Sequence, residues 1–88
     1  MKIVVYGADW CPESRTTLKF LDKNKVKYEY VDIEKNPEAG DLVIELNEKL
    51  GKGPYKSIPT IVIDDFNVLS EPSNEELAEA LGIDAKFI

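Results

Sequence analysis

The first part of the chain pairs a short apolar run with a helical pattern. Residues 2–6 are almost wholly apolar rather than alternating, which predicts a strand buried on both faces. Residues 7–10, which read Gly-Ala-Asp-Trp, predict a loop. Pro12 suits the first position of a helix, and the apolar spacing beyond it predicts a helix over about residues 12–24. Cys11 is therefore the expected N-cap of this helix. The residues expected on its core face are Leu18, Phe20 and Leu21.

The middle of the chain predicts a second strand and a second helix. Residues 27–33 alternate between the two sides of a strand. Asn36 and Pro37 form an N-cap and first-turn pair, and Gly51 is a typical residue for ending a helix. The apolar face expected for this helix consists of leucines at every fourth position and a neighbouring valine: Leu42, Leu46, Leu50 and Val43.

The last part of the chain predicts a hairpin and a third helix. Residues 60–63 and 66–69 are two short runs of strand-forming residues around an Asp64–Asp65 turn, which favours an antiparallel hairpin. Ser73 and Glu76 have the spacing of a capping box, which predicts the start of a helix. The residues expected to face inward from this helix are Leu77, Ala80 and Leu81.

The predicted elements follow one another in the order βαβαββα. A β-α-β start requires a right-handed crossover between parallel strands, and the hairpin then adds antiparallel strands. The expected architecture is an α/β fold with a four-stranded mixed sheet and three flanking helices, which is the arrangement of the thioredoxin fold. Because 88 residues suffice for one core, residues 1–88 are expected to form a single domain.

The composition narrows the classes of function. The net charge of −6 argues against a nucleic-acid surface, because phosphates would be repelled. The apolar runs are too short to cross a membrane, and the N-terminus does not have the pattern of a signal peptide, so the cytoplasm is the default location. One cysteine and no histidine exclude an intrachain disulfide and a zinc site built only from Cys and His. We therefore expect a monomer with no bound metal and no nucleic-acid or membrane partner.

Cys11 is the main candidate for chemistry. An N-cap position directs free backbone N–H groups and the positive end of the helix dipole at the sulfur, and both favour the reactive thiolate. The ordinary alternative is a buried, inert thiol, but the polar neighbours Asp9 and Glu13 favour an accessible and reactive one. Ser14 could donate a hydrogen bond to the sulfur, yet a hydroxyl cannot resolve a mixed disulfide.

Two motifs together resemble a known family. Residues 10–14 read Trp-Cys-Pro-Glu-Ser after the first strand, and residues 58–60 read Ile-Pro-Thr before the third strand. With this combination, residues 2–82 resemble the glutaredoxins, most closely the glutaredoxin-like hydrogen donors that share features with thioredoxin. The resemblance implies a thioredoxin fold and thiol–disulfide exchange.

The resemblance also implies roles for individual residues. Cys11 would be the nucleophile, with Ser14 beside it in the catalytic motif, and Pro59 would be a cis-proline opposite the sulfur. The backbone of Ile58 would pair with the extended backbone of a bound thiol or peptide. The other substrate-binding residues implied are Trp10 and Tyr55 as an apolar rim, together with Pro12 and Thr60. For Trp10, a position in the core is an equally open alternative.

The chain departs from the family pattern in three places. Ser14 stands where a resolving cysteine is usual, and Cys-Pro-Glu-Ser is not the Cys-Gly-Phe-Ser signature of the cluster-binding monothiol members. Ala8 stands where glutathione-using members commonly have a lysine, and residues 69–74 lack the usual Gly-Gly pair. Amides at the start of the last helix could bind an anion, but Glu71 would repel it. We therefore expect no tightly bound cofactor, only weak support for glutathione, and a protein disulfide or a small thiol as partner.

The sequence leaves three functions open. The first is a thiol–disulfide oxidoreductase that forms a mixed disulfide on Cys11. An external thiol would resolve it, or a cysteine at position 14 if Ser14 is an engineered replacement. The second is an iron–sulfur carrier in which two chains each supply Cys11 and two glutathiones complete the four thiolates. The third is a redox-inactive interaction domain that kept the fold and lost the chemistry.

Overall fold

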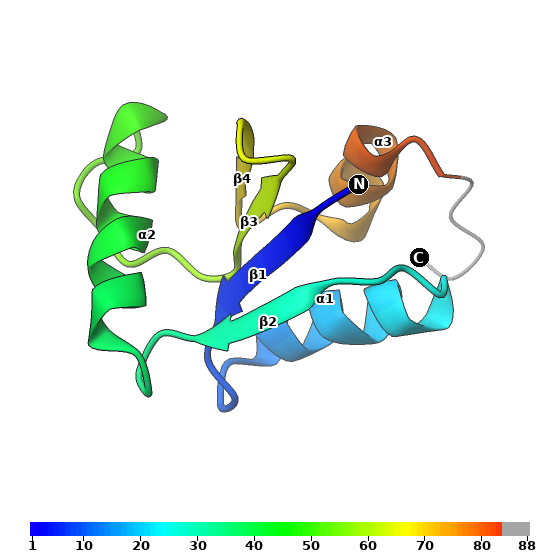
Figure 1. Cartoon of the computed structure of the whole chain (residues 1–88), viewed down its shortest axis with the longest axis horizontal. Coiled ribbons are helices and arrows are strands. Elements are labelled where there is room, and N and C mark those ends of the chain that lie inside the picture. The colour runs from blue at the N-terminus through cyan, green and yellow to red at the C-terminus, as the bar shows by residue number, and fades with distance from the viewer. Residues whose placement is uncertain (84–88) are drawn as a thin grey trace.

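The computed structural model describes residues 1–83 and contains four strands and three helices (Figure 1). Their order confirms the predicted βαβαββα. The strand β2 is shorter than the predicted strand at residues 27–33, because its pairing with β1 begins only at Glu29. The bounds of the elements are β1 Ile3–Gly7, α1 Pro12–Lys23, β2 Glu29–Asp32, α2 Pro37–Lys49, β3 Thr60–Ile63, β4 Asn67–Ser70 and α3 Asn74–Leu81.

The sheet is mixed and has the strand order β2-β1-β3-β4. The strand β1 runs parallel to β2 and antiparallel to β3, and β3 runs antiparallel to β4. Asp64 and Asp65 both have positive φ, 51° and 67°, which is the conformation of a tight hairpin turn between β3 and β4. The apolar run at the start of the chain thus forms a central strand, in agreement with the prediction that it is buried on both faces.

Helices cover both faces of the sheet, with α2 on one face and α1 and α3 on the other (Figure 1). The main core lies on the side of α1 and α3, because the odd-numbered residues of β1 and β3 meet apolar side chains of these two helices there. Among residues 1–83, no helix combines the length and the hydropathy needed to cross a bilayer. The buried members of the core are Ile3, Val5, Phe20, Leu21, Ile61, Ile63, Leu77, Ala78 and Leu81.

The helix starts follow the signals in the sequence. Cys11 is the N-cap of α1, and a proline follows it. In α3, the Ser73 hydroxyl accepts a hydrogen bond from the Glu76 amide, and the Glu76 carboxylate accepts one from the Ser73 amide, so the capping box is present. The predicted Ala80 is half-buried and packs against the core, and Ala78, which was not predicted, is the buried alanine of α3. Positions 78 and 80 flank the core-facing line of the helix at nearly equal angles, so only the docking of the helix decides which of them is buried more deeply.

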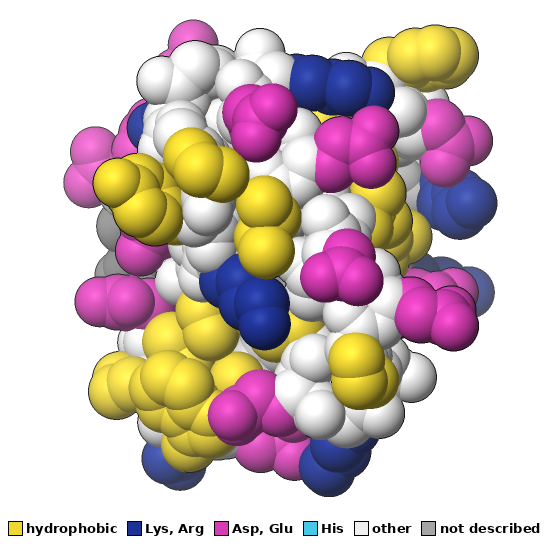
Figure 2. All heavy atoms as spheres, turned by 90° about the vertical axis from the view of Figure 1, so that its left-hand side faces the viewer, with side chains coloured by type: hydrophobic (Ala, Val, Ile, Leu, Met, Phe, Trp, Pro, Cys, Tyr) yellow, Lys and Arg dark blue, Asp and Glu magenta, His cyan; other side chains and the backbone are white. Residues whose placement is uncertain are grey.

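The apolar face predicted for α2 is partly wrong. Val43 is fully buried, but Leu42 and Leu50 are 38% and 42% exposed. The buried line of the helix continues from Val43 to the polar Asn47, because Asn47 hydrogen-bonds to side chains of β3 and β4. These bonds turn Asn47, rather than the row of leucines, toward the sheet. Figure 2 faces this side of the molecule and shows hydrophobic side chains among carboxylates on the surface.

Candidate functional site

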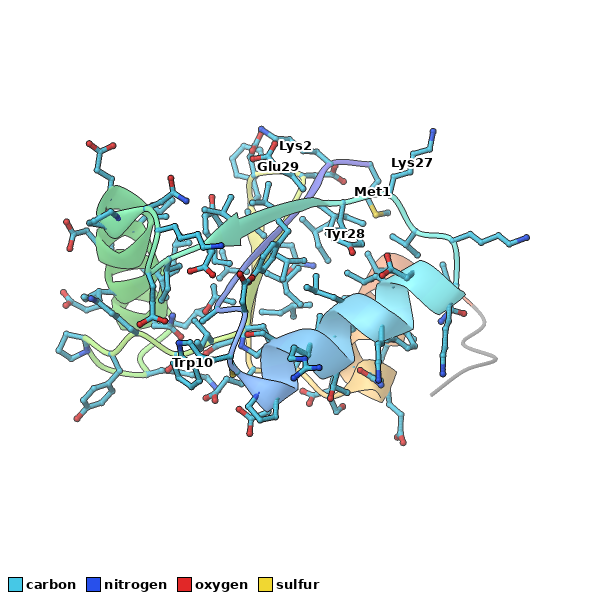
Figure 3. All side chains as sticks on the ribbon, turned by 90° about the horizontal axis from the view of Figure 1, so that it is seen from below. Met1, Lys2, Trp10, Lys27, Tyr28 and Glu29 are labelled. Carbon is cyan, nitrogen blue, oxygen red and sulfur yellow. The ribbon has the colours of Figure 1, made fainter. Side chains whose placement is uncertain are left out.

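The sheet topology brings the two motifs to the same end of the sheet. Because β1 and β3 are antiparallel neighbours, with Tyr6 opposite Thr60, the loop after β1 lies beside the segment before β3. The Ile58–Pro59 peptide bond in that segment is cis, as the resemblance implies. Figure 3 shows Trp10 at the start of α1, well away from Lys27 on the opposite side of the view.

Cys11 has the backbone of a helix N-cap, with φ −77° and ψ 118°. Its N–H donates to Ala8 O at 3.0 Å, and its C=O accepts from the Arg15 N–H at 3.1 Å, so the turn is fixed on both sides. The thiol donates a long hydrogen bond to the carboxylate of Glu13, with 3.9 Å between Sγ and Oε2. The side chain is only 4% exposed, so the prediction of an accessible thiol is wrong. The polar neighbours on which that prediction rested occupy the surface, and the sulfur does not.

Ser14 packs against β1. Its side chain is fully buried, and its hydroxyl oxygen accepts a hydrogen bond from the Ala8 amide at 3.4 Å. In the described part of the chain, this hydroxyl forms no hydrogen bond with the Cys11 sulfur. Gly7 makes the close packing possible, because a Cβ at position 7 would lie 2.6 Å from the Ser14 Oγ. The space at position 14 is therefore set by Gly7.

Side chains from β2 and the turn after it hold the loop before Cys11. The carboxylate of Asp9 accepts hydrogen bonds from the Tyr30 hydroxyl at 2.8 Å and from the Lys35 ammonium at 3.0 Å. The bond from Lys35, and then that from Tyr30, lowers the pKa of Asp9 below its ordinary value. The same contact raises the pKa of Lys35, whereas burial, followed by the bond to Asp9, raises the pKa of Tyr30. The negative charge of Asp9 is thus compensated locally.

Asp32 ties this loop to the end of β2. It is 8% exposed, and its carboxylate accepts hydrogen bonds from the backbone amides of Asp9 at 3.2 Å, Glu34 at 2.8 Å and Lys35 at 3.3 Å. The Trp10 indole N–H donates to the Glu34 carboxylate. Trp10 therefore lies at the surface, 65% exposed, and the alternative of a core position for it is wrong.

Hydrogen bonds fix the segment around the cis-proline. The Thr60 hydroxyl donates to Ser57 O at 2.6 Å, and the Glu71 amide donates to Pro59 O at 2.7 Å. Within residues 1–83, neither the N–H nor the C=O of Ile58 has a hydrogen-bond partner, so both can pair with an added strand. Thr60 is fully buried, and its side chain supports the segment from inside.

A groove of about 670 Å³ lies between α1 and the start of α3. Four of its lining residues are glutamates and none is lysine or arginine, so the groove disfavours anions. The Ser73 amide that caps Glu76 holds the pKa of this carboxyl below its ordinary value, which keeps it charged. Cys11 does not line the groove, but its neighbour Glu13 does. The lining residues are Glu13, Thr16, Thr17, Pro59, Glu71, Pro72, Ser73, Asn74, Glu75 and Glu76.

The other residues implied as a substrate rim are at the surface. Tyr55 is 66% exposed, close to the value for Trp10, and Pro12 is exposed as well. The ring of Tyr55 packs over Gly53, where a Cβ would lie 2.8 Å from Cε2. Among residues 1–83, no group of three or more His, Cys, Asp or Glu side chains is arranged to hold a metal ion.

Sequence reasoning missed the residues that support the site from other elements. Asp32 ends a strand and is followed by a polar turn, which is the pattern of an Asx turn and could have indicated its bonds to the Glu34 and Lys35 amides. Asn47 lies in the last turn of α2, one turn after the buried Val43, and a polar residue in line with a core position is itself a signal that a partner is needed. The role of Tyr30 has no comparable signal, because its partner Asp9 is distant in sequence.

Comparisons with known proteins agree with the fold. Residues 3–68 match the family model described as Glutaredoxin. Mycoredoxin 1 of Corynebacterium glutamicum is 29% identical over 75 residues, which cover 85% of this chain and 86% of that protein. The solved structure of Methanosarcina acetivorans methanoredoxin has a TM-score of 0.73 at 27% identity and covers 93% of this chain and 85% of its own. The glutaredoxin of Archaeoglobus fulgidus has a TM-score of 0.70 at 26% identity and covers 90% and 84%. Since the family model covers most of the chain, the protein belongs to the glutaredoxin family and has its thioredoxin fold.

Proposed function

We propose that the protein exchanges a disulfide through Cys11 and forms a mixed disulfide with its partner. The observation that carries this proposal is the juxtaposition of the Cys11 N-cap with the cis-Pro59 segment at one end of the sheet. The free backbone groups of Ile58 provide a place where an extended substrate can align beside the sulfur.

The reaction follows from the chemistry of a thiolate. The Cys11 thiolate attacks one sulfur of the substrate disulfide, a new S–S bond forms, and the other substrate sulfur leaves as a thiolate. The positive end of the α1 dipole favours negative charge at the N-cap, but in the described residues no first-turn amide donates to the Cys11 side chain, and the Glu13 carboxylate opposes the charge. Ser14 cannot attack the mixed disulfide, so a thiol from outside the chain completes the cycle.

A protein disulfide suits the site better than glutathione does. The glutamate-lined groove repels the carboxylates of glutathione, while main-chain pairing at Ile58 suits an extended peptide of any sequence. The exposed rings of Trp10 and Tyr55 offer an apolar surface for such a partner. The monomeric state and the cytoplasmic location stay predictions from the sequence.

The proposal is tested with a short peptide whose cysteine carries a 5-thio-2-nitrobenzoate leaving group. Attack by Cys11 releases the coloured thiolate, and the mass of the protein increases by that of the peptide. We expect the folded protein to react faster than the same chain in concentrated urea at the same pH, and Cys11→Ser to be inert. A folded protein that reacts no faster than the unfolded chain contradicts the proposal and favours a redox-inactive interaction domain.

The iron–sulfur alternative has its own discriminating experiment. Cys11 is the single thiol of the chain, so a cluster would need two chains and two additional thiols. Anaerobic reconstitution with iron, sulfide and glutathione tests this arrangement. A coloured dimer supports the carrier function, and a colourless monomer argues against it.

A further inference from the structure

A buried polar chain of hydrogen bonds connects α2 to the segment that carries the cis-proline. Asn47 is 0% exposed, and its amide nitrogen donates to Val43 O at 2.8 Å and to Thr60 Oγ1 at 3.1 Å. Its amide oxygen accepts from the Ser70 hydroxyl. Burial of an amide is unfavourable unless its hydrogen bonds are made, and here both ends of the amide have partners in three elements.

The donor and acceptor roles in this series of hydrogen bonds follow from the number of hydroxyl protons available. A threonine hydroxyl has one proton, and because Thr60 Oγ1 accepts from Asn47, its proton is available for Ser57 O at 2.6 Å. If the Asn47 donor were absent, the hydroxyl would lose the neighbour that orients it. Asn47 thereby determines that the carbonyl of Ser57 is held from inside the fold.

The held carbonyl is adjacent to the backbone that receives the substrate. The Ser57 carbonyl belongs to the same peptide unit as the Ile58 N–H, so fixing the carbonyl also fixes the direction of that N–H. On the other side, the Glu71 amide holds Pro59 O at 2.7 Å. The peptide unit before Ile58 and the peptide unit after Pro59 are thus anchored, while the N–H and C=O of Ile58 have no partner within residues 1–83.

We propose that Asn47 is a positioning residue for substrate recognition, which acts through Thr60 and Ser57 to orient the Ile58 backbone toward an incoming peptide. This inference rests on the proposed function, because it concerns how the same site binds its substrate. Asn47 does not touch the sulfur, and the loop of Cys11 is held separately by Asp32. Its loss should therefore weaken peptide binding and leave the intrinsic reactivity of the thiol unchanged.

The variant Asn47→Leu removes the hydrogen bond from Asn47 to Thr60, and Thr60→Val removes that bond together with the one from Thr60 to Ser57. Leucine has the same number and branching of side-chain heavy atoms as asparagine without its donor, and valine has the shape of threonine without its hydroxyl. Ser70→Ala is the matched control, because it removes a hydrogen bond from the same asparagine and leaves the Asn47–Thr60–Ser57 branch intact. Two rates are measured for each folded variant: alkylation by iodoacetamide, and release of 5-thio-2-nitrobenzoate from the activated peptide at increasing concentration.

We expect Asn47→Leu and Thr60→Val to raise the half-saturating peptide concentration roughly ten-fold, the factor that corresponds to ordering one residue of backbone during binding. Alkylation and the maximal rate should stay within about two-fold of the parent protein, as should all values for Ser70→Ala. The inference is overturned if the half-saturating peptide concentration is unchanged in both variants. It is also overturned if the rate of alkylation falls by the same factor as peptide binding weakens, because that would indicate a general disruption of the fold. If Asn47→Leu does not fold, Thr60→Val decides alone. A parent protein that does not react with the peptide refutes the proposed function itself, and this outcome is distinct from the others.

Discussion

Gly7 and Ser14 pack so closely that substitutions at the two positions should be strongly coupled. A Cβ added at Gly7 would lie 2.6 Å from Oγ and 2.9 Å from Cβ of Ser14, whereas ordinary contact begins at 3.4 Å. Only Tyr30 Cε1, at 3.5 Å, is at a normal distance. Gly7→Ala therefore forces β1 and the first turn of α1 apart by several tenths of an ångström.

The magnitude follows from how little either element can yield. Ser14 is attached to a helix whose Phe20 and Leu21 are in the core, and β1 is paired on both sides. Overpacking of this kind costs about 1–3 kcal/mol, and the reduced entropy of the unfolded chain offsets less than about 1 kcal/mol of it. We expect Gly7→Ala to lower the free energy of unfolding by about 2 kcal/mol and Tm by about 10 °C.

The assay is urea denaturation of four proteins: the parent, Gly7→Ala, Ser14→Gly and the double variant. Ser14→Gly alone should cost about 1–2 kcal/mol, because glycine is unfavourable in a helix and the bond from the Ala8 amide is lost. In the double variant both clashing atoms are absent, and the new methyl group occupies the space of the serine side chain. It should be at least as stable as Ser14→Gly. The packing argument would be refuted if the changes in the free energy of unfolding of the two single variants added up in the double variant. It would also be refuted if Gly7→Ala were as stable as the parent.

Three further predictions concern the capping box of α3, the charge of the groove and the resolution of the mixed disulfide. The lowered pKa of Glu76 means that its capping bond stabilises the fold above pH 4.5 and that this contribution is lost as pH falls through the lower folded value. Urea unfolding of Glu76→Ala should lack that part of the pH dependence, and Ser73→Ala should cost about 1 kcal/mol at neutral pH. The acidic groove should make Cys11 react faster with cystamine than with dithiodipropionate at low salt. Glu71→Gln should reduce this preference more than Glu79→Gln, a control outside the groove; equal effects would contradict the role of the groove. Ser14→Cys should raise turnover with a dithiol by about ten-fold or more in a coupled reductase assay, and no gain would argue against a mixed-disulfide mechanism.

The fold was largely predictable because its signals are local. Prolines and capping residues mark the helix starts, and the almost wholly apolar run of residues 2–6 indicated that β1 is a central strand. The face of α2 was not predictable in the same way. Its leucines form the more regular pattern, but the buried face is chosen by hydrogen bonds from Asn47 to residues 13 and 23 positions away. A hydrophobic pattern contains no information about such partners.

In the candidate site, too, local signals predicted some features and contacts between distant residues decided the others. The cysteine, the cis-proline and their common location follow from motifs and strand order, whereas the burial of Cys11 and the inward position of Thr60 depend on packing. A polar sequence neighbourhood indicates that a segment is at the surface, but it does not determine which of its side chains is exposed. In this loop the exposed side chain is Trp10, and the sulfur is covered.

The two parts of the proposed reaction are supported by different hydrogen-bond networks. The loop of Cys11 is held by Asp32 and by the Asp9–Lys35 pair at the end of β2. The backbone of Ile58 is held from the other direction, by the buried chain from Asn47. Since no described hydrogen bond joins the two networks, thiol reactivity and substrate alignment should vary independently. Substitutions at Lys35 should then change the rate of alkylation without changing peptide saturation, the reverse of the pattern expected for Asn47.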